Sequence, residues 1–171
     1  MTSVDAEDLA AAHRAAMARL PAGVAVLAAA RPTPRGTQQV AATVTSVTSA
    51  SLDPPLVLVC VHADSRVRDV LDDVGTWAVS ILDATAQADA DWLATPGRPV
   101  VDQLAPVPHR VGAVSGAALL ERAQAWLECR TVWVHAAGDH DVVVGEVLSA
   151  EVAPADRGAL VHRLGRVRPL G

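Results

Sequence analysis

The chain has 171 residues, of which 51% are hydrophobic and 19% are charged, and a formal net charge of -5 at pH 7. This length predicts a single domain spanning residues 1–171, because domains most often hold roughly 100–150 residues. A mean hydropathy of +0.28 excludes a disordered chain. The excess of acidic residues argues against nucleic-acid binding. No run approaches the roughly 18 apolar residues of a membrane span, and the N-terminus has no signal-peptide h-region, so we expect a cytoplasmic protein.

The residue types missing from the chain also restrict its chemistry. It contains no Phe and no Tyr, so its four tryptophans are the only large aromatic side chains and a flat ligand has few stacking partners. Cys60 and Cys129 each lie in an apolar run without CxxC spacing, which predicts two buried, reduced thiols. The six histidines show neither HxH nor HExxH spacing, so we assign no metal site.

The first third of the chain predicts one helix and then strands. Residues 5–19 are rich in alanine and begin with acidic residues, as helices do. The apolar stripe of this helix would consist of Leu9, Ala12, Ala16 and Leu20. Segments 23–30 and 38–50 predict two strands joined by a hairpin or a longer loop. The continuous apolar run 54–62 predicts a buried strand.

The middle of the chain alternates helices and strands before a long loop. Ser65 is expected to cap a helix over 66–74, which Gly75 ends before a strand over 76–82. Thr85 is expected to cap a second helix that runs through Leu93. Residues 95–116 contain four prolines and three glycines, which predicts a lid-like loop. Its means of docking onto the body would be Val100, Val101 and Leu104.

The last third predicts two long strands, 125–137 and 141–153, joined by the turn Gly138-Asp139-His140. Antiparallel strands without regular βαβ alternation predict a mainly β fold, a closed barrel or sandwich with a few helices packed outside. Without GxGxxG and P-loop motifs a Rossmann nucleotide site has no support, so a dinucleotide would have to bind by another geometry. No serine lies in a GxSxG motif, so a hydrolytic triad has no support.

Three segments could carry chemistry. Six hydroxyl side chains lie within nine positions of segment 42–55, which suits the polar rim of a flavin but also suits a strand that faces water. Ser65, Arg66 and Arg68 lie at a predicted helix start, which favours a phosphate, with an ordinary capped helix as the alternative. His140 follows a turn-forming glycine and could equally be an exposed hairpin residue.

Taken in order, these segments resemble the flavin reductase domain family. The resemblance rests on ARLPAGVAVL at 18–27, ATVTSVTSASLDPPLVLVCV at 42–61, HADSR at 62–66 and AGDHDVVVGEV at 137–147. It implies an FMN-binding split barrel of antiparallel Greek-key strands with peripheral helices. It further implies that the protein binds FMN or FAD and pairs as a homodimer.

The resemblance also implies an activity and its residues. The activity is that of an NAD(P)H:flavin oxidoreductase, which transfers hydride from nicotinamide to flavin N5 and supplies reduced flavin to a partner monooxygenase. In similar proteins the isoalloxazine is bordered by the positions matching Thr43, Val44, Thr45 and Ser46, and the ribityl chain by Ser49. The phosphate is approached by the positions matching Val61, His62, Ser65 and Arg66. The position matching His140 lies near the nicotinamide nucleotide, which makes His140 the candidate catalytic residue.

Two alternatives remain for a protein of this fold. The first is a flavin-dependent oxidase or monooxygenase that acts on an organic substrate near the lid-like loop. The second is a flavin-binding module without turnover. Consumption of NAD(P)H in the presence of free flavin separates the reductase from both.

Overall fold

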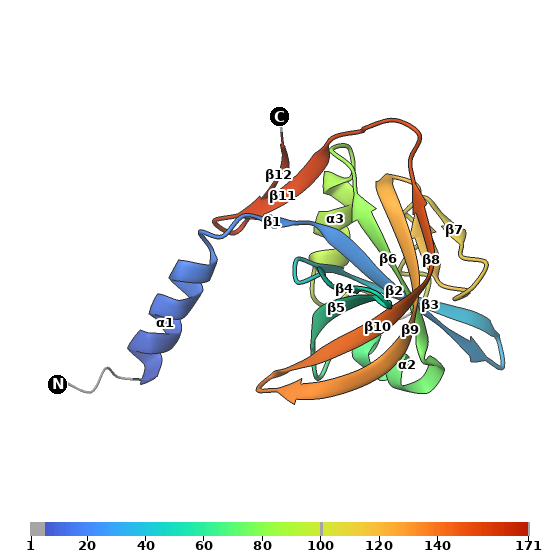
Figure 1. Cartoon of the computed structure of the whole chain (residues 1–171), viewed down its shortest axis with the longest axis horizontal. Helices are drawn as coiled ribbons and strands as arrows, with labels where there is room; N and C mark the ends of the chain where they lie inside the picture. The colour runs from blue at the N-terminus through green and yellow to red at the C-terminus, as the bar shows by residue number, and fades with distance from the viewer. Residues whose placement is uncertain (1–5, 100, 171) are drawn as a thin grey trace.

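The computed structural model describes residues 6–99 and 101–170, which form three helices and twelve strands (Figure 1). The helices are α1 (Ala6–Met17), α2 (Arg66–Val74) and α3 (Gln87–Ala94). The first six strands are β1 (Ala22–Gly23), β2 (Ala25–Thr33), β3 (Gly36–Val44), β4 (Thr48–Leu52), β5 (Pro55–His62) and β6 (Thr76–Leu82). The last six are β7 (His109–Val111), β8 (Ala118–Leu120), β9 (Ala123–Ala137), β10 (His140–Val152), β11 (Ala159–Arg163) and β12 (Arg166–Leu170).

A seven-stranded antiparallel sheet in the order β3-β2-β6-β9-β10-β5-β4 dominates the fold, which confirms the predicted mainly β architecture. Strands β1, β11 and β12 form a small second sheet, and β7 pairs with β8. The hairpin between β9 and β10 turns at Gly138, whose φ of 71° lies in the left-handed region that glycine adopts at little cost.

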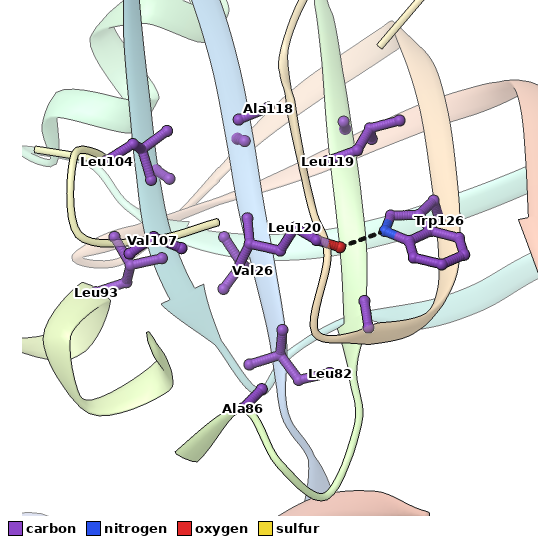
Figure 2. Packing of buried hydrophobic residues seen from close by; sticks show 14 of the residues in the cluster. Val26, Leu82, Ala86, Leu93, Leu104, Val107, Ala118, Leu119, Leu120 and Trp126 are labelled. Atoms are coloured by element: carbon purple, nitrogen blue, oxygen red, sulfur yellow. Dashed lines mark hydrogen bonds between the residues drawn. The ribbon is translucent and has the colours of Figure 1, made fainter. Parts of the chain in front are cut away.

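The first six residues of β2, an interior strand of the large sheet, are buried on both faces, each face against its own core. Along β2 the side chains alternate between the two cores. Leu27 packs with Trp77 and the buried residues of α2 in one cluster, which we call the inner core. Val26 packs with Leu93 and Leu120 in the other cluster, which we call the outer core. Figure 2 shows the outer core, where Val26 and Leu120 lie near Leu82 and the indole of Trp126 donates to the Leu120 carbonyl at 2.7 Å. Burial on both faces explains the continuous apolar run of β2.

The predicted helix ends are correct for α2 but not for α3. Ser65 caps α2 by accepting from the Arg68 amide at 3.2 Å, and Gly75 ends the helix in the left-handed conformation, as predicted. The expectation that Thr85 caps α3 is wrong: Ala86 precedes the helix, and the Thr85 hydroxyl instead donates to Asp83 at 2.6 Å. The buried Asp83 carboxylate competes for this hydroxyl and turns the chain before the helix begins.

Helix α1 stands clear of the barrel (Figure 1). Its described residues 7–17 are exposed, and Leu9 retains 62% of its accessible surface. Residue 5, where the helix was expected to begin, lies outside the described residues. The apolar stripe is therefore present but does not pack on this chain's own core. None of the three described helices is long and apolar enough to cross a membrane.

The long loop after α3 is anchored by Leu104 and Val107, which are buried in the outer core near Leu93 (Figure 2). The expected docking residue Val101 is 72% exposed, because the chain turns at Asp102 and presents Val101 to solvent; Val100 lies outside the described residues. The segment is not wholly irregular, since its last part forms β7.

The two thiols have different surroundings. Cys129 is fully buried beside Trp77, and burial together with the Glu128 charge raises its pKa to about 12, as expected of an inert core cysteine. The expectation of burial is wrong for Cys60, which is only partly buried, because its side chain lies on the face of β5 opposite to that of Val59 and Val61.

Candidate functional site

A cavity of about 720 Å³ lies beside β3, between the start of α2 and the segment that follows α3. Four of the residues singled out in the sequence line it, namely Thr43 from β3, His62 from the end of β5, and Ser65 and Arg66 at the start of α2. The opposite wall is the segment 93–98. This volume lies within the range of about 300–1,000 Å³ that is typical of small-molecule sites.

The other predicted site residues of the hydroxyl-rich segment and β5 do not line this cavity. Thr45 and Ser49 are exposed, Val44 packs partly against the inner core, and Val61 is buried in that core. The Ser46 hydroxyl donates to the Cys60 carbonyl at 2.9 Å and accepts from the Cys60 amide at 3.1 Å. Ser46 thus ties the connection after β3 to β5.

Thr43 joins the same segment to α3. Its hydroxyl donates to the carbonyl of Ala90 at 2.7 Å, so the side chain spans from β3 to the helix that carries the far wall. Together with the bond between Ser46 and Cys60, this contact determines where the backbone of residues 43–46 lies. The hydroxyls therefore position the strand end beside the cavity.

Arg66 connects the start of α2 to the loop that follows α3. Its guanidinium donates to the carbonyl of Arg98 at 2.8 Å and to that of Pro99 at 3.2 Å. Arg68, which the sequence also suggested for an anion, has a different role: its side chain is buried and pairs with Asp141 at 2.6 Å and with Asp72. Only two positions along α2 separate a cavity residue from a core ion pair, because residues two apart on a helix point in different directions.

Arg98 is a cavity residue that the sequence did not reveal. Its guanidinium donates to the carbonyls of Trp92 and Ala41, but its buried Nε has no hydrogen-bond partner among the described residues. Burial and the nearby charge of Arg66 lower the pKa of Arg98. The only sequence signal is a basic residue in the turn-rich segment TPGRP; no spacing indicates that it faces a residue 32 positions earlier.

Two histidines lie together at the end of this site. His140, the first residue of β10, is paired with His62 of β5, and the two ring centroids are 5.2 Å apart at an interplanar angle of 68°. The Nδ1 of His140 lies 2.7 Å from the Asp139 carboxylate, and this hydrogen bond lowers the pKa of Asp139. With Nδ1 engaged, Nε2 is the ring nitrogen that can meet a ligand.

The cavity has the electrostatics of an anion site. Arg66 and Arg98 lie near each other, and neither guanidinium forms an ion pair with a carboxylate of residues 6–99 or 101–170. The orphaned Nε of Arg98 is an additional buried donor. Asp64 also lines the cavity, but two guanidiniums without an ion-pair partner among the described residues, beside a helix start, fit a phosphate-bearing ligand. No tryptophan lines the cavity, so the ligand must pack against aliphatic groups and imidazole.

Comparison with known proteins places the chain among relatives of similar architecture. Residues 17–171 match the model of the flavin reductase like domain. The chain belongs to this flavin reductase family. The match covers the barrel, the cavity and both histidines, and it begins at the last residue of α1.

Several flavin reductases share most of their length with this chain. An NADH-dependent FAD reductase of Streptomyces globisporus is 40% identical over 141 residues, which cover 82% of this chain and 75% of the relative. An NADH-dependent FMN reductase of Streptomyces nodosus subsp. asukaensis is 38% identical over 156 residues, which cover 89% and 80%. These two relatives differ in the flavin that their names specify.

Solved flavin reductases have the same split-barrel fold. The Streptomyces globisporus NADH:FAD oxidoreductase, solved in complex with NAD and FAD fragments, superposes with a TM-score of 0.87 at 34% identity and covers 100% of this chain and 98% of its own. The flavin reductase component of a bacterial two-component tryptophan halogenase gives a TM-score of 0.86 at 36% identity, over 94% and 98% of the two chains.

Proposed function

We propose that this protein is an NAD(P)H:flavin oxidoreductase that supplies reduced FMN or FAD to a partner monooxygenase. The observation that supports this most is the cavity lined by the start of α2, Arg66, Arg98 and His62, with His140 in contact with His62. A bound flavin would supply N5 as the acceptor of a hydride from the nicotinamide, and this chemistry would require no protein acid or base. A site whose lining includes amides, hydroxyls and guanidiniums beside the imidazole of His62 suits chemistry of this kind.

The residues of the site would act mainly by placement. We propose that Ser65 and Arg66 hold the flavin phosphate, that the segment from Thr43 to Ser46 borders the ring and that Ser49 lies toward the ribityl chain. Val61 and His62 would support the strand end beside the phosphate. His140 would use Nε2 to orient the nicotinamide nucleotide, which must approach within roughly 3–3.5 Å of the acceptor atom.

The proposal is tested by the flavin affinity of the purified protein and by NADH and NADPH oxidation in the presence of FMN or FAD. Arg66→Ala should weaken flavin binding by about 1–3 kcal/mol, the range for a lost hydrogen bond between charged groups. Arg166→Ala, on the exposed start of β12, is the matched control and should leave flavin affinity unchanged.

Two other results would contradict parts of this proposal. Flavin affinity that is unchanged in Arg66→Ala, with a normal melting curve, would show that residues 65–68 only cap a helix. Flavin binding without NAD(P)H oxidation would overturn the reductase proposal in favour of an oxidase or a binding module.

We propose further that the protein is a homodimer. Helix α1 exposes Leu9 and Met17, and the hairpin of β9 and β10 exposes Val132 and Trp133, each with about half or more of its surface accessible. A helix that stands clear of its own barrel needs an apolar partner, and a second copy supplies the same barrel surface. Sedimentation should give a dimer at micromolar concentration; a flavin-bound monomer would contradict the proposal.

We also propose that the protein works in the cytoplasm. The free thiols Cys60 and Cys129 are compatible with that reducing compartment. Fractionation of the source cells, with flavin reductase activity followed in each fraction, tests this.

A further inference from the structure

An ion pair joins helix α2 to strand β10. The Nε of Arg68 donates to the carboxylate of Asp141 at 2.6 Å, and only 11% and 16% of the two side chains remain exposed. Arg68 also pairs with Asp72, one turn further along α2, whose side chain is 63% exposed. Arg68 thus has one carboxylate partner within its own helix and another, largely shielded from water, on a strand 73 residues away.

The two ends of this pair lie next to residues of the candidate site. Arg68 comes shortly after Arg66, which lines the cavity, and the amide of Arg68 donates to the hydroxyl of Ser65 at 3.2 Å. At the other end, Asp141 directly follows His140 in β10. The pair therefore connects the proposed flavin-phosphate residues with the proposed nicotinamide residue.

The alternation of side chains along β10 separates the ion pair from the site itself. Asp141 is paired with Val61 of β5, and both Val61 and Val143 belong to the inner core. His140 is paired with His62 instead, and consecutive residues of a strand point to opposite faces. The bond made by Asp141 thus holds the backbone from which His140 projects and leaves the imidazole free for a nucleotide.

The surrounding contacts hold this region less directionally. Helix α2 is packed on the inner core by apolar side chains, whose contacts do not prescribe one orientation. Residues 132–139 of the β9–β10 hairpin are exposed, and the Asp139 carbonyl accepts from the Ala63 amide at 3.0 Å. A hydrogen bond between charged groups has a defined length and direction, so the ion pair can fix the place of α2 relative to β10.

We propose that the ion pair between Arg68 and Asp141 is a positioning device for hydride transfer, which holds His140 at a fixed distance from the start of α2. This inference rests on the proposed flavin reductase function and adds two positioning residues that touch neither nucleotide. Hydride transfer depends on this distance, because the reacting atoms must lie within roughly 3–3.5 Å and a 1 Å misplacement can cost about 100-fold in rate. Burying two charges costs much of what their attraction gains, so a shielded pair suits the fixing of geometry more than the adding of stability.

The first test is Asp141→Asn, which keeps the shape of the side chain and removes its charge. Anaerobic stopped-flow reduction of FMN and of FAD is followed at saturating NADH and NADPH, at a temperature where circular dichroism shows the variant to be folded. The limiting rate should fall about tenfold, because His140 is no longer held at one distance from the flavin. The Kd for flavin should stay within about twofold, because Ser65 and Arg66 are unchanged.

Two further variants separate the position of the pair from its charge. Asp72→Asn is the matched control, because it removes the other carboxylate of Arg68 but keeps the link to β10; its limiting rate should stay within about twofold of wild type. Arg68→Lys keeps the positive charge but not the planar set of donors, so its limiting rate should fall by about threefold or more.

A double-mutant cycle tests whether the pair acts through His140. In the His140→Ala background the group to be positioned is missing, so adding Asp141→Asn should not slow flavin reduction further. A general loosening of the fold would instead lower the rate by the same factor in both backgrounds. This readout distinguishes positioning from a purely structural role.

The outcomes also separate this inference from the function on which it rests. If wild type reduces flavin and neither Asp141→Asn nor Arg68→Lys changes the limiting rate, the ion pair only stabilises the fold and the inference is wrong. Rate losses that multiply in the double variant, or a loss in Asp72→Asn equal to that in Asp141→Asn, would overturn it as well. If the wild-type protein binds flavin but oxidises neither NADH nor NADPH, the reductase proposal fails and the positioning role fails with it.

Discussion

Glu128 anchors the last turn of the long loop, and its removal tests how that loop is held. The side chain is buried, and its Oε2 accepts hydrogen bonds from the amides of Val114 and Ser115 at 3.0 and 2.7 Å and from the Ser115 hydroxyl at 2.8 Å. A Cβ on Gly112 would lie 2.3 Å from Oε2, so the turn fits closely around the carboxylate. We consider Glu128→Gln, which keeps the shape and removes the charge.

The expected loss follows from the three hydrogen bonds. The amide oxygen of Gln can accept the same donors, but hydrogen bonds to a charged acceptor are about twice as strong as neutral ones. Because all three share one oxygen, their losses do not simply add, and we expect about 2 kcal/mol in the free energy of unfolding. For a chain of this length that corresponds to a fall in Tm of about 4–8 °C.

The pH dependence supplies a second, independent check. Burial alone would raise the pKa of Glu128, but the hydrogen bonds from Ser115 and Val114, with the Arg110 charge, bring it below the usual value. The charged form therefore stabilises the fold above the unfolded-state pKa of about 4.3, and this stability is lost as the pH falls through the lower folded-state pKa. The difference between wild type and Glu128→Gln should narrow below about pH 4.3.

Urea denaturation at pH 7 and at several acidic pH values measures both effects. Glu146→Gln is the matched control, because Glu146 forms a surface pair with Arg130 at 2.6 Å and its loss should cost less than about 1 kcal/mol. Equal losses in Glu128→Gln and Glu146→Gln at pH 7, or a difference that does not shrink in acid, would refute the reasoning.

Three further substitutions test the core and the site. Gly145→Ala should destabilise the protein by about 1–3 kcal/mol in urea denaturation, because the new Cβ would lie 2.3 Å from the buried indole of Trp77. Asp141→Asn should cost about 1–3 kcal/mol, because Arg68 loses a charged partner at 2.6 Å but keeps Asp72; an unchanged unfolding midpoint would contradict this. His140→Ala should slow flavin reduction in stopped-flow experiments and leave flavin affinity within about twofold, whereas an unaltered rate would make His140 only a turn residue.

Gly23→Ala serves as the control for Gly145→Ala, because nothing lies within 4 Å of a Cβ built at Gly23. Its effect on the unfolding free energy should be small. Comparable losses in the two variants would show that backbone freedom of glycine, and not contact with Trp77, accounts for the Gly145 result.

The sequence alone determined those helix ends and turns that depend on interactions between residues close together in the chain. Ser65 and Gly75 bound α2 because a cap residue acts on amides and carbonyls within the same turn of helix. Gly138 permits the tight turn between β9 and β10 for a similar reason. The motifs in segments 42–61 and 137–147 identified the flavin reductase family, and with it the strand ends at which the cavity lies.

Only the tertiary structure decided which side chains meet and which remain uncovered. Arg66 reaches the carbonyl of Arg98 across 32 residues, and Arg68, two positions along the same helix, pairs with Asp141 instead. The stripe through Leu9 has the periodicity of a core-facing helix but is exposed on this chain. Periodicity and capping report interactions over a few residues, whereas contacts between distant segments depend on how the whole barrel packs; a single sequence does not encode these contacts in any local pattern.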